Sequence, residues 1–284
     1  RLGARGGTAI VMDTKTGEIY AMSNIRINED GTYSSQSGNF AAVEANEPGS
    51  VAKVFSIAAA INEGAVDTAS SFSVPGSQVF DKGTQWEYKV TDAYPHGLED
   101  MSVRKIFVDS SNIGTIQISR TLDTKKNHEY LKLFGFGTRT SVEYPGESRG
   151  SLRPVSKWQG TEKFSFSYGY GYTSTALQLA AAVNVVANKG VYVAPKMLLK
   201  STDKDGTTIS TPASATHQVL SASTAQTMTA LMTDVVCYGT GKLAKMPGIS
   251  VAGKTGTAYK LQDNGTYTND EGARTYFASF VGFL

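Results

Sequence analysis

Strand-like segments lie at the two ends of this chain, and the patterns of helices lie between them. The strand-like segments are residues 8–13, 18–22, 250–259 and 275–284. The first two flank a Thr-Lys-Thr-Gly turn, which is typical of a β-hairpin. A sheet assembled from distant ends of a chain indicates an α+β fold. We therefore predict one sheet from about residues 1–46 and 240–284, and a mainly helical part over about 47–239.

The middle of the chain has the residue spacing of helices. Helical patterns cover residues 51–61, 102–122, 173–189 and 221–236. Ser50 precedes the first of these and Gly64 follows it, as a helix N-cap and a residue past the C-terminus would. Gly114 interrupts the second pattern.

Composition and charge exclude several classes of function. The 27 Lys and Arg residues nearly balance the 25 Asp and Glu residues, so the net charge of +2 offers no strong basic field to a nucleic acid partner. Cys237 is the single cysteine, which excludes an internal disulfide and a cysteine-based metal site. His96, His128 and His217 are scattered without metal-ligand spacing. We expect no metal and no cofactor.

Both ends of the chain have the character of cut sites. The first residue is Arg1, and no signal peptide or apolar run of about 18 residues is present. The last residues, 279–284, lie inside an apolar, strand-like run. We expect this chain to be part of a longer protein.

A serine nucleophile needs a nearby base, and Ser-x-x-Lys on a helix can supply one because residues i and i+3 share a face. The pattern occurs three times, at Ser50/Lys53, Ser102/Lys105 and Ser201/Lys204. The second begins a helix, where Ser is an ordinary N-cap, and the third lies in a polar turn. Ser50 can be an N-cap too. Only around Lys53 are the neighbours small and apolar, so that burial would lower its pKa and make the amine a base.

Two further motifs accompany the first. Lys-Thr-Gly occurs at residues 15–17, in the hairpin turn, and at 254–256, in a strand-like segment. In a strand, Gly256 leaves the backbone open to a ligand, and the hydroxyls of Thr255 and Thr257 lie on one face. Ser-x-Asn occurs at Ser110 and Asn112, within the second helical pattern.

The order of these motifs resembles the enzymes that penicillin acylates, whose Ser-x-x-Lys and Lys-Thr-Gly signatures appear in the same sequence. Residues 166–171 (Phe-Ser-Tyr-Gly-Tyr-Gly), 176–180 and 188–190, and the Glu-Pro-Gly-Ser before Val51, resemble class B penicillin-binding proteins, and the cell-division transpeptidases most closely. The resemblance spans the whole chain. It differs at Ser174–Ala176 and Tyr259, where relatives more often carry Thr-Pro and Gln or Glu; these differences touch none of the three motifs.

The resemblance implies a fold and a cellular setting. The fold is an antiparallel sheet flanked by helices with a mainly helical lobe, as in penicillin-binding proteins and serine β-lactamases. Residues 1–284 would form a single transpeptidase domain that lacks its last strand and helix, which would leave the edge at Thr8–Asp13 exposed. An N-terminal membrane anchor and pedestal would lie outside this chain, at the extracytoplasmic face of the bacterial membrane.

The resemblance also implies a reaction. Ser50 would attack the penultimate D-alanine carbonyl of a peptidoglycan stem peptide, and an amine from a neighbouring strand would resolve the acyl-enzyme. Lys53 would take the Ser50 proton, and Lys254 with Ser110 would relay a proton to the leaving amine. Asn112 would hold Lys53 and the substrate amide. β-Lactam antibiotics would acylate the same serine.

Substrate binding is implied for the strand that carries the second Lys-Thr-Gly. The Thr255 and Thr257 hydroxyls, beside Gly256, would bind the terminal carboxylate of the substrate or β-lactam. The backbone N–H groups of Ser50 and Thr257 would form the oxyanion hole. A membrane glycosyltransferase and other division proteins would be partners.

Three alternatives share these motifs. A serine β-lactamase or β-lactam sensor needs fast deacylation or a different second motif. The chain has no Glu-x-x-Leu-Asn string, which carries the deacylating glutamate of class A β-lactamases. Asn112 stands where class D β-lactamases carry Val. A D,D-carboxypeptidase would use water in place of the amine. An inactive scaffold of a wall-synthesis complex is the non-enzymatic alternative.

Overall fold

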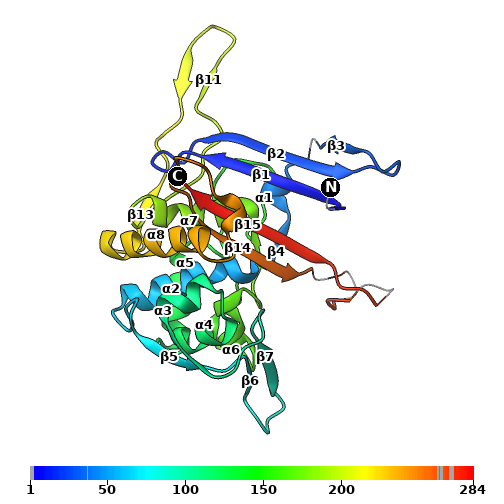
Figure 1. The fold of residues 1–284 in the computed structure, drawn as a ribbon. Helices are drawn as coiled ribbons and strands as arrows, with labels where there is room; N and C mark the ends of the chain where they lie inside the picture. Colours follow the sequence, from blue (N-terminus) through cyan, green and yellow to red (C-terminus); the bar gives the residue numbers. More distant parts are fainter. Residues whose placement is uncertain (1–2, 37, 261, 263–264, 269–271) are drawn as a thin grey trace.

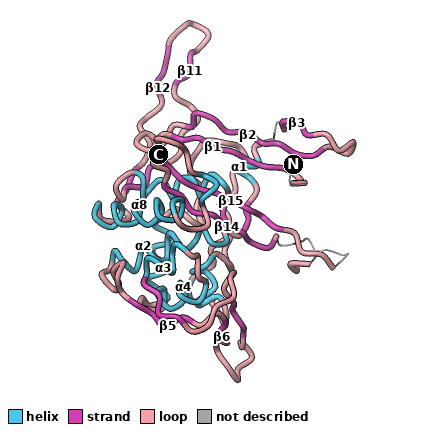
Figure 2. The backbone as a smooth tube through the Cα atoms, viewed as in Figure 1, coloured by secondary structure: helices cyan, strands magenta, loops and turns pink. Residues whose placement is uncertain are grey.

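The computed structural model describes residues 3–36, 38–260, 262, 265–268 and 272–284. The α+β class predicted from the sequence is confirmed, and Figure 2 shows the helices gathered on one side of the long strands. At the N-terminal end, an antiparallel sheet has the order β1-β2-β3, formed by β1 (Gly6–Met12), β2 (Ile19–Ile27) and β3 (Tyr33–Ser35). At the C-terminal end, β14 (Ala252–Tyr259) pairs antiparallel with β15 (Tyr276–Phe283).

The two groups of strands differ from the single sheet that the sequence predicted. Among the described residues, β1–β3 and β14–β15 are separate hydrogen-bonded sheets (Figure 1). Both β1 and β15 contact α7 (Ala176–Ala187), so packing on a common helix, and not a shared ladder, relates the two sheets. Within the described residues β1 pairs on one side only, and Val11 is 55% exposed, so the predicted open edge at Thr8–Asp13 is present.

Most of the helices lie below β1 and β2 in the view of Figure 1. Their bounds are α1 (Phe40–Val43), α2 (Lys53–Asn62), α3 (Val103–Val108), α4 (Asn112–Ser119), α5 (Thr124–Leu133), α6 (Glu162–Ser165), α7 and α8 (Ala222–Cys237). In the described part of the chain, four 3₁₀ turns accompany them: η1 (Gly49–Ala52), η2 (Val155–Lys157), η3 (Phe166–Tyr168) and η4 (Lys242–Ala244). The pattern predicted over 102–122 is two helices, because the chain turns between α3 and α4 around Ser110.

Short pairs of strands also lie in or next to the part of the chain, about residues 47–239, that the sequence predicted to be mainly helical. They are β4 (Ala45–Asn46) with β9 (Ser174–Thr175), β5 (Ser71–Val74) with β8 (Glu99–Ser102), β6 (Ser77–Phe80) with β7 (Tyr88–Thr91), β10 (Val191–Val193) with β13 (Thr216–Gln218), and β11 (Lys200–Thr202) with β12 (Thr208–Ser210). The β11–β12 and β6–β7 hairpins project at opposite ends of the molecule (Figure 1).

Helix α2 is the centre of the hydrophobic core. Its residues from Lys53 to Ala60 are all buried, which fits a helix that is apolar on every side. Phe55 packs against Phe134 and Phe136 with ring centroids 4.9 Å apart in both pairs. Among the described residues, no helix combines the length and the apolar character needed to cross a membrane. Helix α2, at the centre of the core, begins at Lys53, the lysine of the first motif.

Candidate active site

Ser50 lies in η1, the tight turn that leads into α2. The N-cap position of η1 is Pro48, and no side chain caps the turn, so the sequence-based interpretation of Ser50 as an N-cap is wrong. The Ser50 carbonyl oxygen instead accepts the Lys53 backbone N–H. No hydrogen bond of the Ser50 hydroxyl exists among the described residues, and the residue is half-buried. Its hydroxyl is left for a ligand.

Three backbone segments meet at Gly49, beside Ser50. Gly49 has a φ of +55°, and a Cβ on it would lie 2.5 Å from the Thr257 carbonyl oxygen. The Gly49 N–H donates to the Gly169 carbonyl at 3.1 Å. A side chain at Gly49 would separate η1 from β14, and one at Gly169 would separate η1 from the segment that carries Gly169. The geometry thus brings the backbones of Ser50 and Thr257, the two predicted oxyanion donors, to adjoining positions.

Lys53 is fully buried and faces the turn between α3 and α4. Its Nζ donates to the Ser110 carbonyl at 2.5 Å, to the Ser110 Oγ at 3.1 Å and to the Asn112 Oδ1 at 2.8 Å. Burial holds the pKa of Lys53 well below its ordinary value, and the charge of Lys254 lowers it further, while Asp92 opposes the shift. An amine in this environment can be neutral at physiological pH and can accept a proton.

The Ser110 hydroxyl lies between two lysines. Lys254 Nζ donates to it at 2.9 Å from β14, and Lys53 Nζ approaches it at 3.1 Å from α2. Burial lowers the pKa of Lys254 to about 7. Four predicted residues (Lys53, Ser110, Asn112 and Lys254) are therefore in one hydrogen-bonded cluster, which can pass a proton through a hydroxyl.

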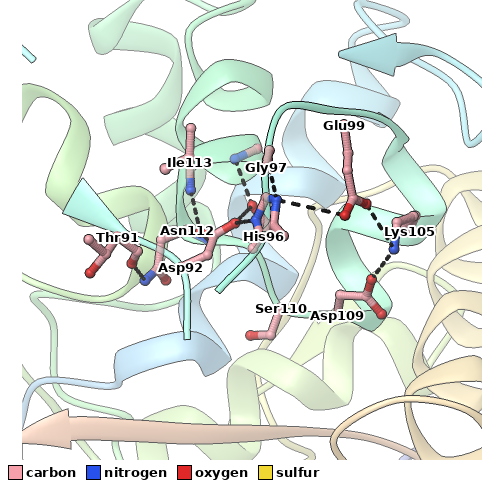
Figure 3. Close-up of polar contacts among 12 residues, drawn as sticks. Thr91, Asp92, His96, Gly97, Glu99, Lys105, Asp109, Ser110, Asn112 and Ile113 are labelled. Carbon is pink, nitrogen blue, oxygen red and sulfur yellow. Dashed lines mark hydrogen bonds and ion pairs between the residues drawn. The ribbon is translucent and has the colours of Figure 1, made fainter. Parts of the chain in front are cut away.

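The turn that carries Ser110 is strained and is held from outside. Ser110 has a φ of +59°, a conformation that costs a non-glycine residue energy and that collects at functional sites. Figure 3 shows Asp92, just after β7, beside this turn. The Asp92 carboxylate accepts the Asn112 N–H at 2.6 Å and the Ile113 N–H at 3.1 Å. Sequence reasoning missed Asp92, because a lone Asp after a strand carries no motif.

Strand β14 presents alternate residues to its two faces. Thr257 is exposed and Thr255 half-buried on one face, while Lys254 and Gly256 are buried on the other. A Cβ at Gly256 would lie 2.8 Å from the Pro48 carbonyl oxygen, so this glycine allows β14 to pack on the nucleophile turn. Its predicted role of leaving the backbone open to a ligand stays a prediction. The Thr255 Oγ1 is 2.6 Å from the Thr240 Oγ1, a partner that no sequence motif indicated.

The Tyr-Gly-Tyr-Gly segment, residues 168–171, also contacts the residues before Ser50. The Glu47 carboxylate accepts the Gly171 N–H at 2.8 Å and the Tyr267 hydroxyl at 2.7 Å. Burial raises the pKa of Glu47. Tyr170 packs edge-to-face on Tyr267, with ring centroids 6.1 Å apart. These contacts hold the Glu-Pro-Gly-Ser segment against Gly171 and Tyr267.

The other copies of each motif lie in ordinary structural roles. The Ser102 hydroxyl caps α3 by accepting the Lys105 N–H, as predicted. Ser201 is exposed in β11, and Lys204 is exposed in the turn that follows. Lys15 lies in the β1–β2 turn. In the described part of the chain, no group of three or more His, Cys, Asp and Glu residues could hold a metal ion.

Comparison with known proteins gives a family match over nearly the whole chain. Residues 7–284 match the model of the penicillin binding protein transpeptidase domain. Penicillin-binding protein PbpB of Mycolicibacterium smegmatis is 35% identical over 99% of this chain and 44% of its own length. The probable peptidoglycan D,D-transpeptidase PenA of Neisseria flavescens is 34% identical over 99% of this chain and 66% of its own length.

A solved structure has the same fold. Penicillin binding protein 3 of Mycobacterium tuberculosis, complexed with aztreonam, superposes with a TM-score of 0.88 at 33% identity, covering 99% of this chain and 63% of the other. A complex of that protein with ampicillin matches with the same TM-score. The chain spans less than half the length of the PbpB relatives it matches.

Proposed function

Since this chain belongs to the transpeptidase domain family of class B penicillin-binding proteins, we propose that it carries the D,D-transpeptidase activity of a longer protein. It cross-links peptidoglycan stem peptides through an acyl-enzyme on Ser50, and β-lactams inhibit it by acylating the same residue. One observation carries the proposal beyond family membership. The Ser110 hydroxyl lies within 3.1 Å of Lys53 Nζ and 2.9 Å of Lys254 Nζ, next to the turn that presents Ser50.

Acylation begins with a proton transfer. The Ser50 hydroxyl gives its proton to the neutral amine of Lys53 while its oxygen attacks the penultimate D-alanine carbonyl carbon. The backbone N–H groups of Ser50 and Thr257 stabilise the oxyanion, and a single such donor is typically worth about 3–4 kcal/mol. Burial supplies the neutral amine, because it holds the pKa of Lys53 well below its ordinary value.

Collapse of the tetrahedral intermediate breaks the peptide C–N bond. The leaving D-alanine amine takes the Ser110 hydroxyl proton, and the Lys53 ammonium returns a proton to Ser110. Lys254 contacts the same hydroxyl and, when protonated, favours neutral Lys53 by charge repulsion. In the second half, an acceptor amine attacks the ester carbonyl, loses a proton to Lys53, and the Ser50 oxygen leaves with a proton.

The terminal carboxylate of the donor peptide binds along β14. Thr255 and Thr257 lie on the face of the strand that is not packed in the core, which supports this role for their hydroxyls. Lys254, on the same strand, adds positive charge when protonated. Asn112 Oδ1 accepts from Lys53 at 2.8 Å and orients the amine.

Hydrolytic alternatives need a base for water. Both carboxylate oxygens of Glu47, in the segment before Ser50, already accept hydrogen bonds from Gly171 and Tyr267. Glu47 is therefore engaged in holding this segment, and the family match favours a long-lived acyl-enzyme, and thus the transpeptidase, over a β-lactamase. The half-life of the penicilloyl-enzyme decides between them: minutes to hours or longer fits the transpeptidase, and rapid turnover would identify a β-lactamase. A D,D-carboxypeptidase would release D-alanine without an amine acceptor.

The setting of the reaction is the extracytoplasmic face of the bacterial membrane, where peptidoglycan is assembled. A membrane anchor in the longer protein, a membrane glycosyltransferase and other cell-division proteins complete the proposal. The relatives named penicillin-binding protein PbpB and stage V sporulation protein D support a role in wall synthesis.

The experiment that tests this function is covalent labelling. Intact mass spectrometry after incubation with benzylpenicillin should show the addition of one penicilloyl group, and peptide mapping should locate it on Ser50. Ser50→Ala should abolish the adduct. Ser102→Ala and Ser201→Ala, the matched controls in the other two Ser-x-x-Lys pairs, should be labelled like the wild type. Labelling that persists in Ser50→Ala would overturn the assignment.

A further inference from the structure

Asp92 is a buried carboxylate outside the three motifs, and it caps the turn on which two of their residues stand. Its side chain is only 5% exposed. Oδ1 accepts the N–H groups of Asn112 and Ile113, and Oδ2 accepts the Ser111 hydroxyl at 2.5 Å. These donors are the first residues of α4 and its N-cap, where a negative charge is favourable. One carboxylate from a distant loop thus fixes the start of this helix.

The capped turn contacts the proposed base directly. Asn112 accepts from Lys53 with its Oδ1 and donates to the Thr91 carbonyl with its Nδ2 at 2.9 Å, so both ends of its side chain are fixed. Ser110, two residues earlier, is held at a φ of +59°. A strained residue persists only where its surroundings determine its conformation. Asp92 contributes a carboxylate to those surroundings, in addition to the two lysines that contact Ser110.

The loop that carries Asp92 is itself anchored. The Asp92 N–H donates to the Gly76 carbonyl at 3.1 Å, and a Cβ at Gly76 would lie 2.2 Å from the His96 carbonyl oxygen. His96 Nε2 lies 3.1 Å from Asp92 Oδ2, and its side chain is 13% exposed. The hydrogen bond to Asp92 raises the pKa of His96, so the pair is favoured as an ion pair.

Charges of alternating sign continue from His96 to Asp109, the residue before Ser110 (Figure 3). His96 Nδ1 lies 4.0 Å from Glu99, Glu99 lies 3.6 Å from Lys105, and Lys105 lies 2.7 Å from Asp109. These groups line a cavity of about 340 Å³. Its other ionisable side chains are Tyr94, Tyr238 and Lys242. His96 faces two carboxylates, and only Asp92 contacts the catalytic turn.

We propose that Asp92 is a positioning residue for the reaction: it holds Ser110 and Asn112 against Lys53, and His96 holds Asp92. This inference rests on the proposed function of Ser50. Asp92 acts through the backbone of the turn and through its charge, and it does not touch the reacting atoms. His96, which has no metal-ligand spacing in the sequence, thereby has a role in supporting the active site through Asp92.

The test is the pH profile of acylation by a fluorescent penicillin, measured on the folded chain for three variants. Asp92→Asn keeps the size of the side chain but removes its charge, so we expect acylation to slow about 10- to 100-fold. The acid limb of its profile should move to lower pH, because a negative charge that favours the Lys53 ammonium is gone. His96→Gln removes a positive charge, and its limb should move to higher pH by a smaller amount.

Asp123→Asn is the matched control, because Asp123 also caps a helix, α5, and its carboxylate accepts the Lys126 N–H rather than any group of the turn between α3 and α4. Its profile should stay within twofold of wild type. A limb at the wild-type position in Asp92→Asn would overturn the proposal even if the rate falls, because loosened packing alone slows acylation at every pH. If Asp92→Asn does not melt cooperatively, His96→Gln decides, and an unmoved limb there overturns the proposal. Wild-type protein that is not acylated would refute the proposed function itself.

Discussion

The backbone of Gly169 contacts the backbone of Gly49 so closely that a Cβ at Gly169 would stand 1.9 Å from the Gly49 carbonyl oxygen. These residues are 120 positions apart in the chain. The contact fixes the turn that carries Ser50, in addition to the contact of Gly49 with Thr257 in β14. It also gives the Tyr-Gly-Tyr-Gly segment a physical role: Gly169 allows a positive φ of +96° and removes the side chain at this contact.

Gly169→Ala should therefore displace the nucleophile turn. We expect acylation by penicillin to slow at least about tenfold, because misplacement by a fraction of an ångström is costly in catalysis. Gly206→Ala is the matched control: Gly206 has a φ of +84° but no atom within 4 Å of its Cβ position. Each variant should lose about 1–2 kcal/mol of stability from the left-handed conformation, and only Gly169→Ala should lose acylation. Equal rates in the two variants would contradict the steric role.

Ser110 combines a catalytic hydroxyl with a strained backbone, and two substitutions separate these properties. Ser110→Ala and Ser110→Gly both remove the hydroxyl between Lys53 and Lys254, so acylation should fall by about 10²–10⁴-fold in each. Gly tolerates the φ of +59°, so Ser110→Gly should be more stable than Ser110→Ala by about 1 kcal/mol. Thermal melting and stopped-flow acylation measure the two effects. Near wild-type acylation in either variant would exclude Ser110 from the proton path.

Burial of Lys254 makes stability depend on pH with a defined sign. Its pKa falls to about 7 in the fold, from about 10.4 in an unfolded chain. The unfolded state therefore binds more protons between these values, and the free energy of unfolding gains a positive slope with pH. Lys254→Met removes that contribution. It also removes a charge that lowers the pKa of Lys53, which reduces the slope further.

We expect the melting temperature of wild type, relative to Lys254→Met, to rise steadily as pH increases from about 7 to 10. Urea unfolding at several pH values measures the same difference as a free energy. Lys242→Met is the control, since Lys242 is exposed and its removal should leave the pH dependence as in wild type. Parallel pH curves for wild type and Lys254→Met would show that the Lys254 charge is not suppressed by burial.

Much of the fold could be predicted from local patterns. The first hairpin, α7 and α8 lie close to their predicted ranges, because amphipathic spacing and capping residues such as Ser221 act locally. The break between α3 and α4 could not be predicted, because the Asp92 carboxylate that caps the start of α4 comes from another part of the chain. The separation of β1–β3 from β14–β15 was also beyond the sequence, since a strand pattern does not specify its neighbour.

The sequence by itself determined which residues carry the chemistry. The order and context of Ser50-Lys53, Ser110-Asn112 and Lys254-Gly256 singled out one copy of each motif, because only those copies combine small or apolar neighbours with the right succession along the chain. The tertiary structure decided what those groups are as acids, bases and donors. Burial lowers the pKa values of Lys53 and Lys254, the charge of Lys254 lowers that of Lys53 further, and the strained turn at Ser110 is held by Asp92. Proton affinity and backbone strain depend on neighbours brought together by folding, and no local pattern of residues encodes them.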